Sequence, residues 1–136
     1  MDYLKVAYLQ QLISFVKTIK GKLSDDLLAV KLYGSTITSK TPHDLDVAII
    51  VKNSVNDPIQ NSVNGRTYCI PELHDEGVLI RRFILDDRIS IHYIIIPQKT
   101  WYKKAPSEPF TRFKQSVMNG FDLFTLINKN KYDKTS

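Results

Sequence analysis

The sequence is poor in the residues that cross-link small domains. It contains a single cysteine, Cys69, so no disulfide can form within the chain, and we expect a reducing, cytoplasmic location. No set of cysteines and histidines has the spacing of a zinc site, and neither a Walker-type phosphate loop nor an acyl-transfer triad is present. No apolar run approaches the roughly 20 residues that a membrane-spanning helix needs. The N-terminus lacks the pattern of a secretory signal. The sequence therefore predicts no membrane partner.

The remaining composition is that of an ordinary globular protein. Of the 136 residues, 43% are hydrophobic and 24% are charged, which is enough for a real core. We expect one domain over residues 1–128 and a polar tail over residues 129–136. The net charge of +5 permits a polyanionic partner but does not require one.

Hydrophobic periodicity predicts an α/β (α+β) fold, a small mixed sheet with helices packed on it. Apolar residues recur at three- and four-residue steps in a first helix, where they form one face: Leu4, Tyr8, Leu12, Phe15, Val16 and Ile19. Ser107 begins a last helix, whose apolar side holds Phe110, Phe113, Val117 and Met118. Residues 53–77 are rich in turn formers, and we expect little regular structure there beyond a short helix near 58–63. The expected helices cover residues 2–20 and 107–119, and the expected strands cover residues 28–33, 44–52, 78–85 and 89–96, the last two as a hairpin.

One stretch carries most of the chemical information. Gly34 and Ser35 follow a short apolar run, and Asp44 and Asp46 head a second apolar run, Val47 to Val51. Carboxylates at i and i+2 of a strand point to the same face, whereas the residues between and after them enter a core. Paired carboxylates on a rigid strand beside a small-residue turn are suited to Mg²⁺ and phosphate.

The order helix, strand, Gly-Ser, Asp-x-Asp strand, hairpin and helix resembles the DNA-polymerase-β-like nucleotidyltransferase superfamily in its small stand-alone form. The resemblance implies that Gly34 and Ser35 bind the triphosphate of an NTP such as ATP. It implies that Asp44 and Asp46 hold Mg²⁺, or Mn²⁺ in its place, as catalytic metal ligands. The implied reaction moves a nucleoside monophosphate to an acceptor hydroxyl and releases pyrophosphate.

This chain departs from the family pattern in two ways. The spacer between Gly34-Ser35 and Asp44 has eight residues, shorter than usual, and Lys40 rather than an arginine is the nearest cation for phosphate. The family's third carboxylate lies on a later strand beside the Asp-x-Asp strand. The matching strand here, ISIHYIII, offers Ser90 and His92 instead. His92 suits a transition metal or the orientation of an acceptor, because neutral imidazole is a poor Mg²⁺ ligand.

The sequence leaves several functions open. The first is an active nucleotidyltransferase, whose acceptor is a protein side chain, an RNA 3′ end or a small molecule. The second is a catalytically weak binding module of the same fold. The third is a basic nucleic-acid-binding domain that uses Lys99, Trp101 to Lys104, Arg112 and Lys114. The same residues are alternatively a solvated basic rim, with Trp101 anchoring the loop to the core. The resemblance also implies a helical partner protein or a homo-oligomer.

For other charged residues, the sequence favours ordinary structural roles. Asp86 and Asp87 read as hairpin-turn residues. The acidic run from Glu72 to Glu76 reads as a solvated loop. Arg81 and Arg82 are adjacent on a strand, so only one of them can face any given groove.

Overall fold

The computed structural model describes residues 6–34, 44–53, 56–65, 70–75, 77–85 and 89–127. The strands are β1 (Leu27–Tyr33), β2 (Asp44–Val51), β3 (Val63–Asn64), β4 (Leu79–Ile84), β5 (Ser90–Pro97) and β6 (Phe121–Asp122). The helices are α1 (Val6–Leu23), α2 (Pro71–Asp75), α3 (Gln98–Trp101) and α4 (Glu108–Met118), and a 3₁₀ turn, η1 (Ser24–Asp26), follows α1.

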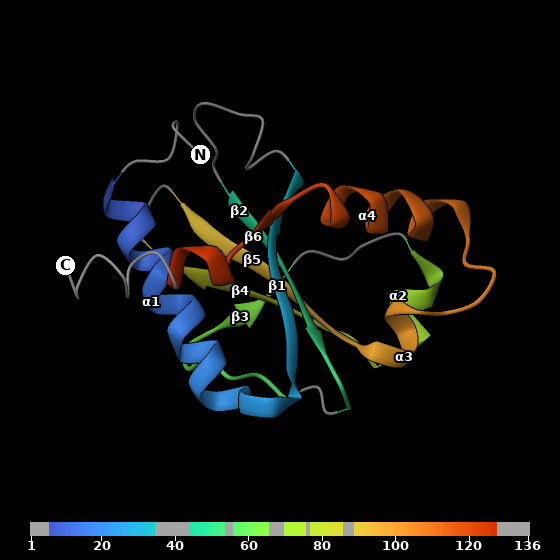
Figure 1. Cartoon of the computed structure of the whole chain (residues 1–136), viewed down its shortest axis with the longest axis horizontal. Helices are drawn as coiled ribbons and strands as arrows, with labels where there is room; N and C mark the ends of the chain where they lie inside the picture. The colour runs from blue at the N-terminus through green and yellow to red at the C-terminus, as the bar shows by residue number, and fades with distance from the viewer. Residues whose placement is uncertain are drawn as a thin grey trace.

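The described strands form one six-stranded mixed sheet in the order β3-β4-β5-β2-β1-β6 (Figure 1). At its centre β2 pairs in antiparallel fashion with β1 and in parallel fashion with β5. Strand β5 in turn pairs in antiparallel fashion with β4, which completes the predicted hairpin. The predicted mixed sheet with helices packed on it is therefore confirmed.

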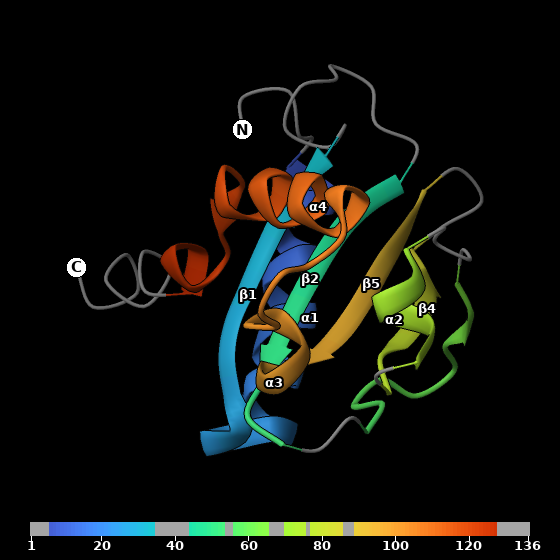
Figure 2. The ribbon, with the colours of Figure 1, turned by 90° about the vertical axis from the view of Figure 1, so that its right-hand side faces the viewer.

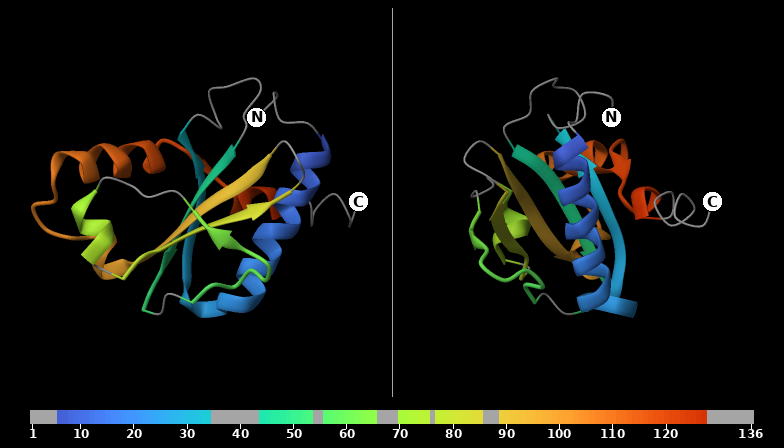
Figure 3. Two further views of the ribbon diagram at one scale, coloured as in Figure 1. Left: turned by 180° about the vertical axis from the view of Figure 1, so that it is seen from behind. Right: turned by 90° about the vertical axis from the view of Figure 1, so that its left-hand side faces the viewer.

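Helices cover the sheet from both sides. Helix α1 crosses one face, and α2, α3 and α4 lie on the other (Figures 2 and 3). Alternate residues of β2 consequently enter different cores, with Leu45 and Val47 on the α1 side and Ala48 and Ile50 on the α4 side. All residues of β5 are buried, as expected for a strand covered on both faces.

Most of the predicted elements are present, with shifted ends. Helix α1 was expected to stop near Lys20, yet it runs through Gly21 to Leu23. A helical glycine costs about 1 kcal/mol relative to alanine. Packing of Leu12, Phe15, Val16 and Ile19, all buried as expected, outweighs that cost. Met118 was expected on the buried side of α4, but 66% of it is exposed.

The segment between β2 and β4 corrects the prediction most. The short helix expected near 58–63 is absent, and a turn leads instead into the edge strand β3. Pro71 lies in the stretch expected to consist mainly of turns, but it begins α2, because proline fits the first turn of a helix. The four-residue α3 was not predicted either.

Glu72 is not the solvated loop residue that its acidic surroundings suggested. It lies on α2 and is 8% exposed. Its Oε1 accepts a hydrogen bond from the Ser107 backbone N–H at 2.6 Å, and its Oε2 accepts one from the Ser107 hydroxyl at 2.9 Å. The bond from the Ser107 backbone N–H lowers the pKa of Glu72. Since Ser107 is also the N-cap of α4, this contact ties α2 to the start of α4.

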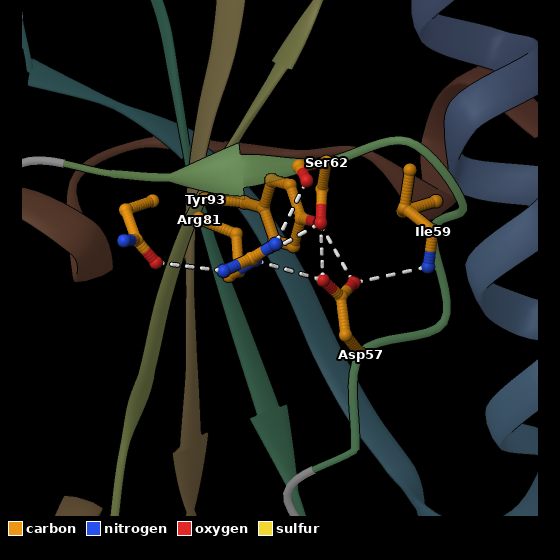
Figure 4. A network of polar contacts seen from close by, with 6 residues as sticks. Asp57, Ile59, Ser62, Arg81 and Tyr93 are labelled. Carbon is orange, nitrogen blue, oxygen red and sulfur yellow. Dashed lines mark hydrogen bonds and ion pairs between the residues drawn. The ribbon is translucent and has the colours of Figure 1, made fainter.

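A second polar network fixes the chain before β3 to the α1 face of the sheet (Figure 4). Asp57 lies at its centre and accepts hydrogen bonds from the Tyr93 hydroxyl at 2.7 Å, from Arg81 Nε at 3.0 Å and from the Ser62 hydroxyl. The Ile59 backbone N–H adds a further bond at 3.0 Å. Burial opposes ionisation of Asp57, but these hydrogen bonds and the Arg81 charge outweigh it and lower its pKa.

No helix in the described ranges is long and apolar enough to cross a membrane.

We expect the Asp57 network to make stability depend on acid. The folded pKa of Asp57 lies below its ordinary value of 3.8, so its stabilisation is complete above that pH and is lost as the pH falls through the folded value. Asp57→Asn should lower the free energy of unfolding by on the order of 1 kcal/mol at pH 7. The gap to wild type should shrink below pH 3.8.

Urea unfolding at several pH values measures this difference. Asp25→Asn is the matched control, because Asp25 is exposed and no hydrogen bond or ion pair to it is found in the described part of the chain. An equal loss in both variants, or a pH-independent gap for Asp57→Asn, would contradict the prediction.

Candidate functional site

The predicted carboxylates lie on the α4 face of β2, at the end where that strand begins. Asp44 and Asp46 are both partly buried, and Leu45 between them is fully buried on the opposite face. The parallel register with β5 places Asp44 beside Ser90 and Asp46 beside His92. The structure thus brings together all four of these predicted residues on two adjacent strands.

Two side chains of β5 lie against the Asp44 carboxylate. The Ser90 hydroxyl donates a hydrogen bond to Asp44 Oδ1 at 3.1 Å. His92 Nε2 lies 3.3 Å from the same oxygen, which is an ion pair when the imidazole is protonated. Ser90 and His92 are themselves buried, at 7% and 5% exposure. The Ser90 hydroxyl therefore orients the Asp44 carboxylate from the neighbouring strand, and the buried His92 ring lies beside the same oxygen.

Gly34 lies against Asp46 from the other neighbouring strand. It follows Tyr33, the residue of β1 that pairs with Asp46. Its φ of +69° belongs to the left-handed region that favours glycine. A Cβ added to Gly34 would lie 3.2 Å from Asp46 Oδ2. The backbone conformation therefore favours glycine, and a side chain at this position would press on the Asp46 carboxylate.

A cationic side chain, Arg82, lies beside His92 on the far side of β5, and we did not assign it to the site. Arg82 and the four site residues, Asp44, Asp46, Ser90 and His92, are called the row below. Arg82 pairs with His92, so Asp46, His92 and Arg82 occupy one line across β2, β5 and β4. Arg81 points to the other face and belongs to the Asp57 network. The expectation that only one of the two arginines faces a given groove is confirmed. The strand alternation was the available signal, but it could not choose between them.

Several predicted positions lie outside the described residues. These are Ser35, Lys40, Asp86 and Asp87. Their roles stay predictions.

The Asp44 and Asp46 carboxylates have the chemistry of ligands for one Mg²⁺ ion that is also bound by substrate, and not of a complete protein metal site. No group of three or more histidine, cysteine or acidic side chains that could hold a metal is found within the described ranges. Mg²⁺, however, is usually held in proteins by one or two carboxylates together with substrate phosphates and water. Asp44 and Asp46 on one face of β2 supply that number of ligands.

The basic and aromatic residues of α3 and α4 form a separate surface. Trp101 is buried, as expected of an anchor to the core, whereas 65% of Tyr102 is exposed. Lys114 Nζ lies 5.2 Å from the centre of the Trp101 ring and 5.8 Å from that of Tyr102. Cation–π contacts of this kind position the lysine against the protein. They account for Lys114 without a nucleic acid.

A cavity of about 560 Å³ lies on the opposite side of the sheet, between α1, the chain at 58–60 and the end of β4. The residues that line it include Phe15, Ile59 and Phe83. None of the row residues lines it, so the cavity is not part of the Asp44–Asp46 site.

Comparison with known proteins gives no match to this chain among family models, curated proteins or solved structures.

Two glycines with the same φ allow the effect of the Gly34 contact with Asp46 to be isolated. Gly34 and Gly77 both have φ of +69°, but a Cβ at Gly77 would have nothing within 4 Å. We expect Gly77→Ala to cost about 1–2 kcal/mol through backbone strain alone. Gly34→Ala should cost more, because its methyl group also displaces the Asp46 carboxylate.

Urea unfolding gives both costs, and the ¹³C signal of the Asp46 carboxyl group reports its displacement. Equal costs together with an unmoved Asp46 signal in Gly34→Ala would show that the contact has no effect.

Proposed function

We propose that this protein is a Mg²⁺-dependent nucleotidyltransferase with a nucleotidyltransferase-like fold. The observation that carries the proposal is the order of groups across the sheet. A left-handed glycine directly after β1, a pair of carboxylates on β2 and a polar pair on the parallel β5 lie side by side. This order supports a site in which a triphosphate lies on the β1 side of Asp44 and Asp46.

Each residue would have a distinct role in this site. The missing Cβ of Gly34 leaves room for phosphate beside the Asp46 carboxylate. Asp44 and Asp46 would hold the divalent cation, and Ser90 and His92 fix the direction of Asp44. Bound there, Mg²⁺ would neutralise phosphate charge and polarise the phosphoryl group. The contribution of the chain is positioning and electrostatics, without a covalent enzyme intermediate.

The reaction would join the acceptor to the nucleoside monophosphate. The acceptor oxygen bonds to the α-phosphorus, the bond from that phosphorus to pyrophosphate breaks, and the hydroxyl proton passes to solvent. The acceptor oxygen and the leaving oxygen lie roughly in line in such a transfer.

A second candidate is a catalytically weak module that binds a nucleotide, an RNA or a partner protein. One observation favours it. The register places Ser90 and His92, rather than a carboxylate, beside Asp44 and Asp46. An acceptor hydroxyl would then lack the negative group that helps to deprotonate it.

Substitution of the two aspartates tests the proposal. Labelled NTPs are incubated with Mg²⁺ or Mn²⁺ and with mixed RNA and protein acceptors. Asp44→Asn and Asp46→Asn should each lower transfer at least about 100-fold, because even outer-shell changes at metal sites cost 10–100-fold. Asp25→Asn, the same change at an exposed position, should leave transfer unaltered.

Binding of a nonhydrolysable NTP, measured with and without Mn²⁺, separates the two candidates. Metal-dependent binding without transfer would favour the binding module. Absence of metal-dependent binding would refute the enzyme and a module that binds nucleotides, and would leave only a module that binds RNA or a partner protein.

A further inference from the structure

The charge along the row changes sign from one side of β5 to the other. Asp44 and Asp46 are on β2, and the Arg82 guanidinium is on β4, two strand spacings away. Neighbouring strands are about 4.8 Å apart, so the two ends of the row are about 10 Å apart at the backbone. One end attracts a cation and the other attracts an anion.

The Arg82 guanidinium is only partly satisfied by the protein. The side chain is half-buried, and its Nε is shielded from solvent with no hydrogen-bond partner among the described residues. Shielded donors without a partner are costly, and an anion that accepted this hydrogen bond would remove the cost. Two apolar residues on the same face, Val63 and Ile84, flank Arg82 and are 39% and 53% exposed. The surface beside the half-buried Arg82 side chain is therefore open to solvent, although Nε itself is covered.

The position of Arg82 relative to Gly34 indicates whether Arg82 would bind the triphosphate or an anion of the acceptor. Gly34 is on the β1 side of Asp46, whereas His92 and Arg82 are on the β5 side. If the triphosphate lies toward Gly34, the in-line requirement places pyrophosphate on that side and the acceptor over β5 and β4. A fixed positive charge there also disfavours a second divalent cation over β5.

We propose that Arg82 binds a phosphate group of the acceptor. The acceptors would then be hydroxyl compounds in which a phosphate group and the reacting oxygen are separated by about the distance between two neighbouring strands. This inference rests on the proposed function. The planar guanidinium matches a phosphate with two parallel hydrogen bonds, which a lysine cannot reproduce. The same chemistry is found in a small phosphorylated alcohol and at the terminal nucleotide of an RNA.

The first experiment uses inorganic phosphate as the probe, in EDTA and without nucleotide. In ¹⁵N NMR spectra, phosphate should shift the Arg82 Nε–H signal saturably in the full chain. Arg112→Gln, at an exposed position of α4, should keep this shift, and Arg82→Gln should remove the signal without unfolding the protein. An Arg82 signal that does not respond to phosphate would overturn the proposal, whatever the transfer assay shows.

The second experiment measures transfer to matched acceptors with Mg²⁺ and labelled NTP. Glycerol 3-phosphate is compared with glycerol, and an RNA oligonucleotide with a 3′ hydroxyl represents the nucleic-acid source. Arg82→Gln should raise KM for the phosphorylated acceptor about 10- to 100-fold, as for loss of a charge-assisted hydrogen bond. KM for the NTP should stay constant, and Arg82→Lys should recover only part of the loss.

The outcomes separate this proposal from the proposed function. A rise in KM for the NTP instead would assign Arg82 to the triphosphate and overturn the proposal. Equal KM values for glycerol and glycerol 3-phosphate in the wild type, with no preference for RNA, would also overturn it. A phosphate shift at Arg82 without transfer to any acceptor would support the anion site and refute the enzymatic function.

Discussion

The parallel pairing of β2 with β5 is the constraint on which the rest of the structure depends. It sets Asp44 beside Ser90 and Asp46 beside His92, and it also sets Leu45, Val47 and Ile49 into the α1 core. The two consequences cannot be separated, because a slip of one residue would exchange the faces of the whole strand. Burial of the apolar residues therefore fixes the positions of the polar ones. The energy that aligns the site comes from the core rather than from the site itself.

The register also explains why much of the site could be predicted. The alternation of Asp44, Leu45 and Asp46 identifies their face, and the long apolar run after Asp46 identifies a central strand. The apolar sequence of β5 indicates a strand inside the sheet, and in the structure its neighbour is β2. The face of the two aspartates followed from the two-residue period of strands and the need to bury apolar surface, whereas the place of Ser90 and His92 beside them was what the family resemblance implied.

The parts that could not be predicted depend on contacts between distant segments. Nothing near Asp57 in the sequence indicates that it would meet Tyr93 and Arg81, which follow it by 36 and 24 residues. In the sequence Glu72 is one acidic residue among several, and only the structure shows that it accepts a hydrogen bond from Ser107. Arg82 was recognised as one of two alternatives, and only the pairing with His92 chose between them. Local patterns predict a face, whereas partners across the fold come from tertiary packing.

The edges of the sheet have a consequence for how this protein associates with others. The outermost described strands, β3 and β6, have two residues each, and β1 has an irregular register between Leu27 and Ala29. Short edges and such irregularities hinder the docking of a further strand from another chain. Aggregation through exposed backbone is thereby discouraged at both borders. For the described part of the chain, such borders favour recognition by another protein through side chains on the helices and sheet faces.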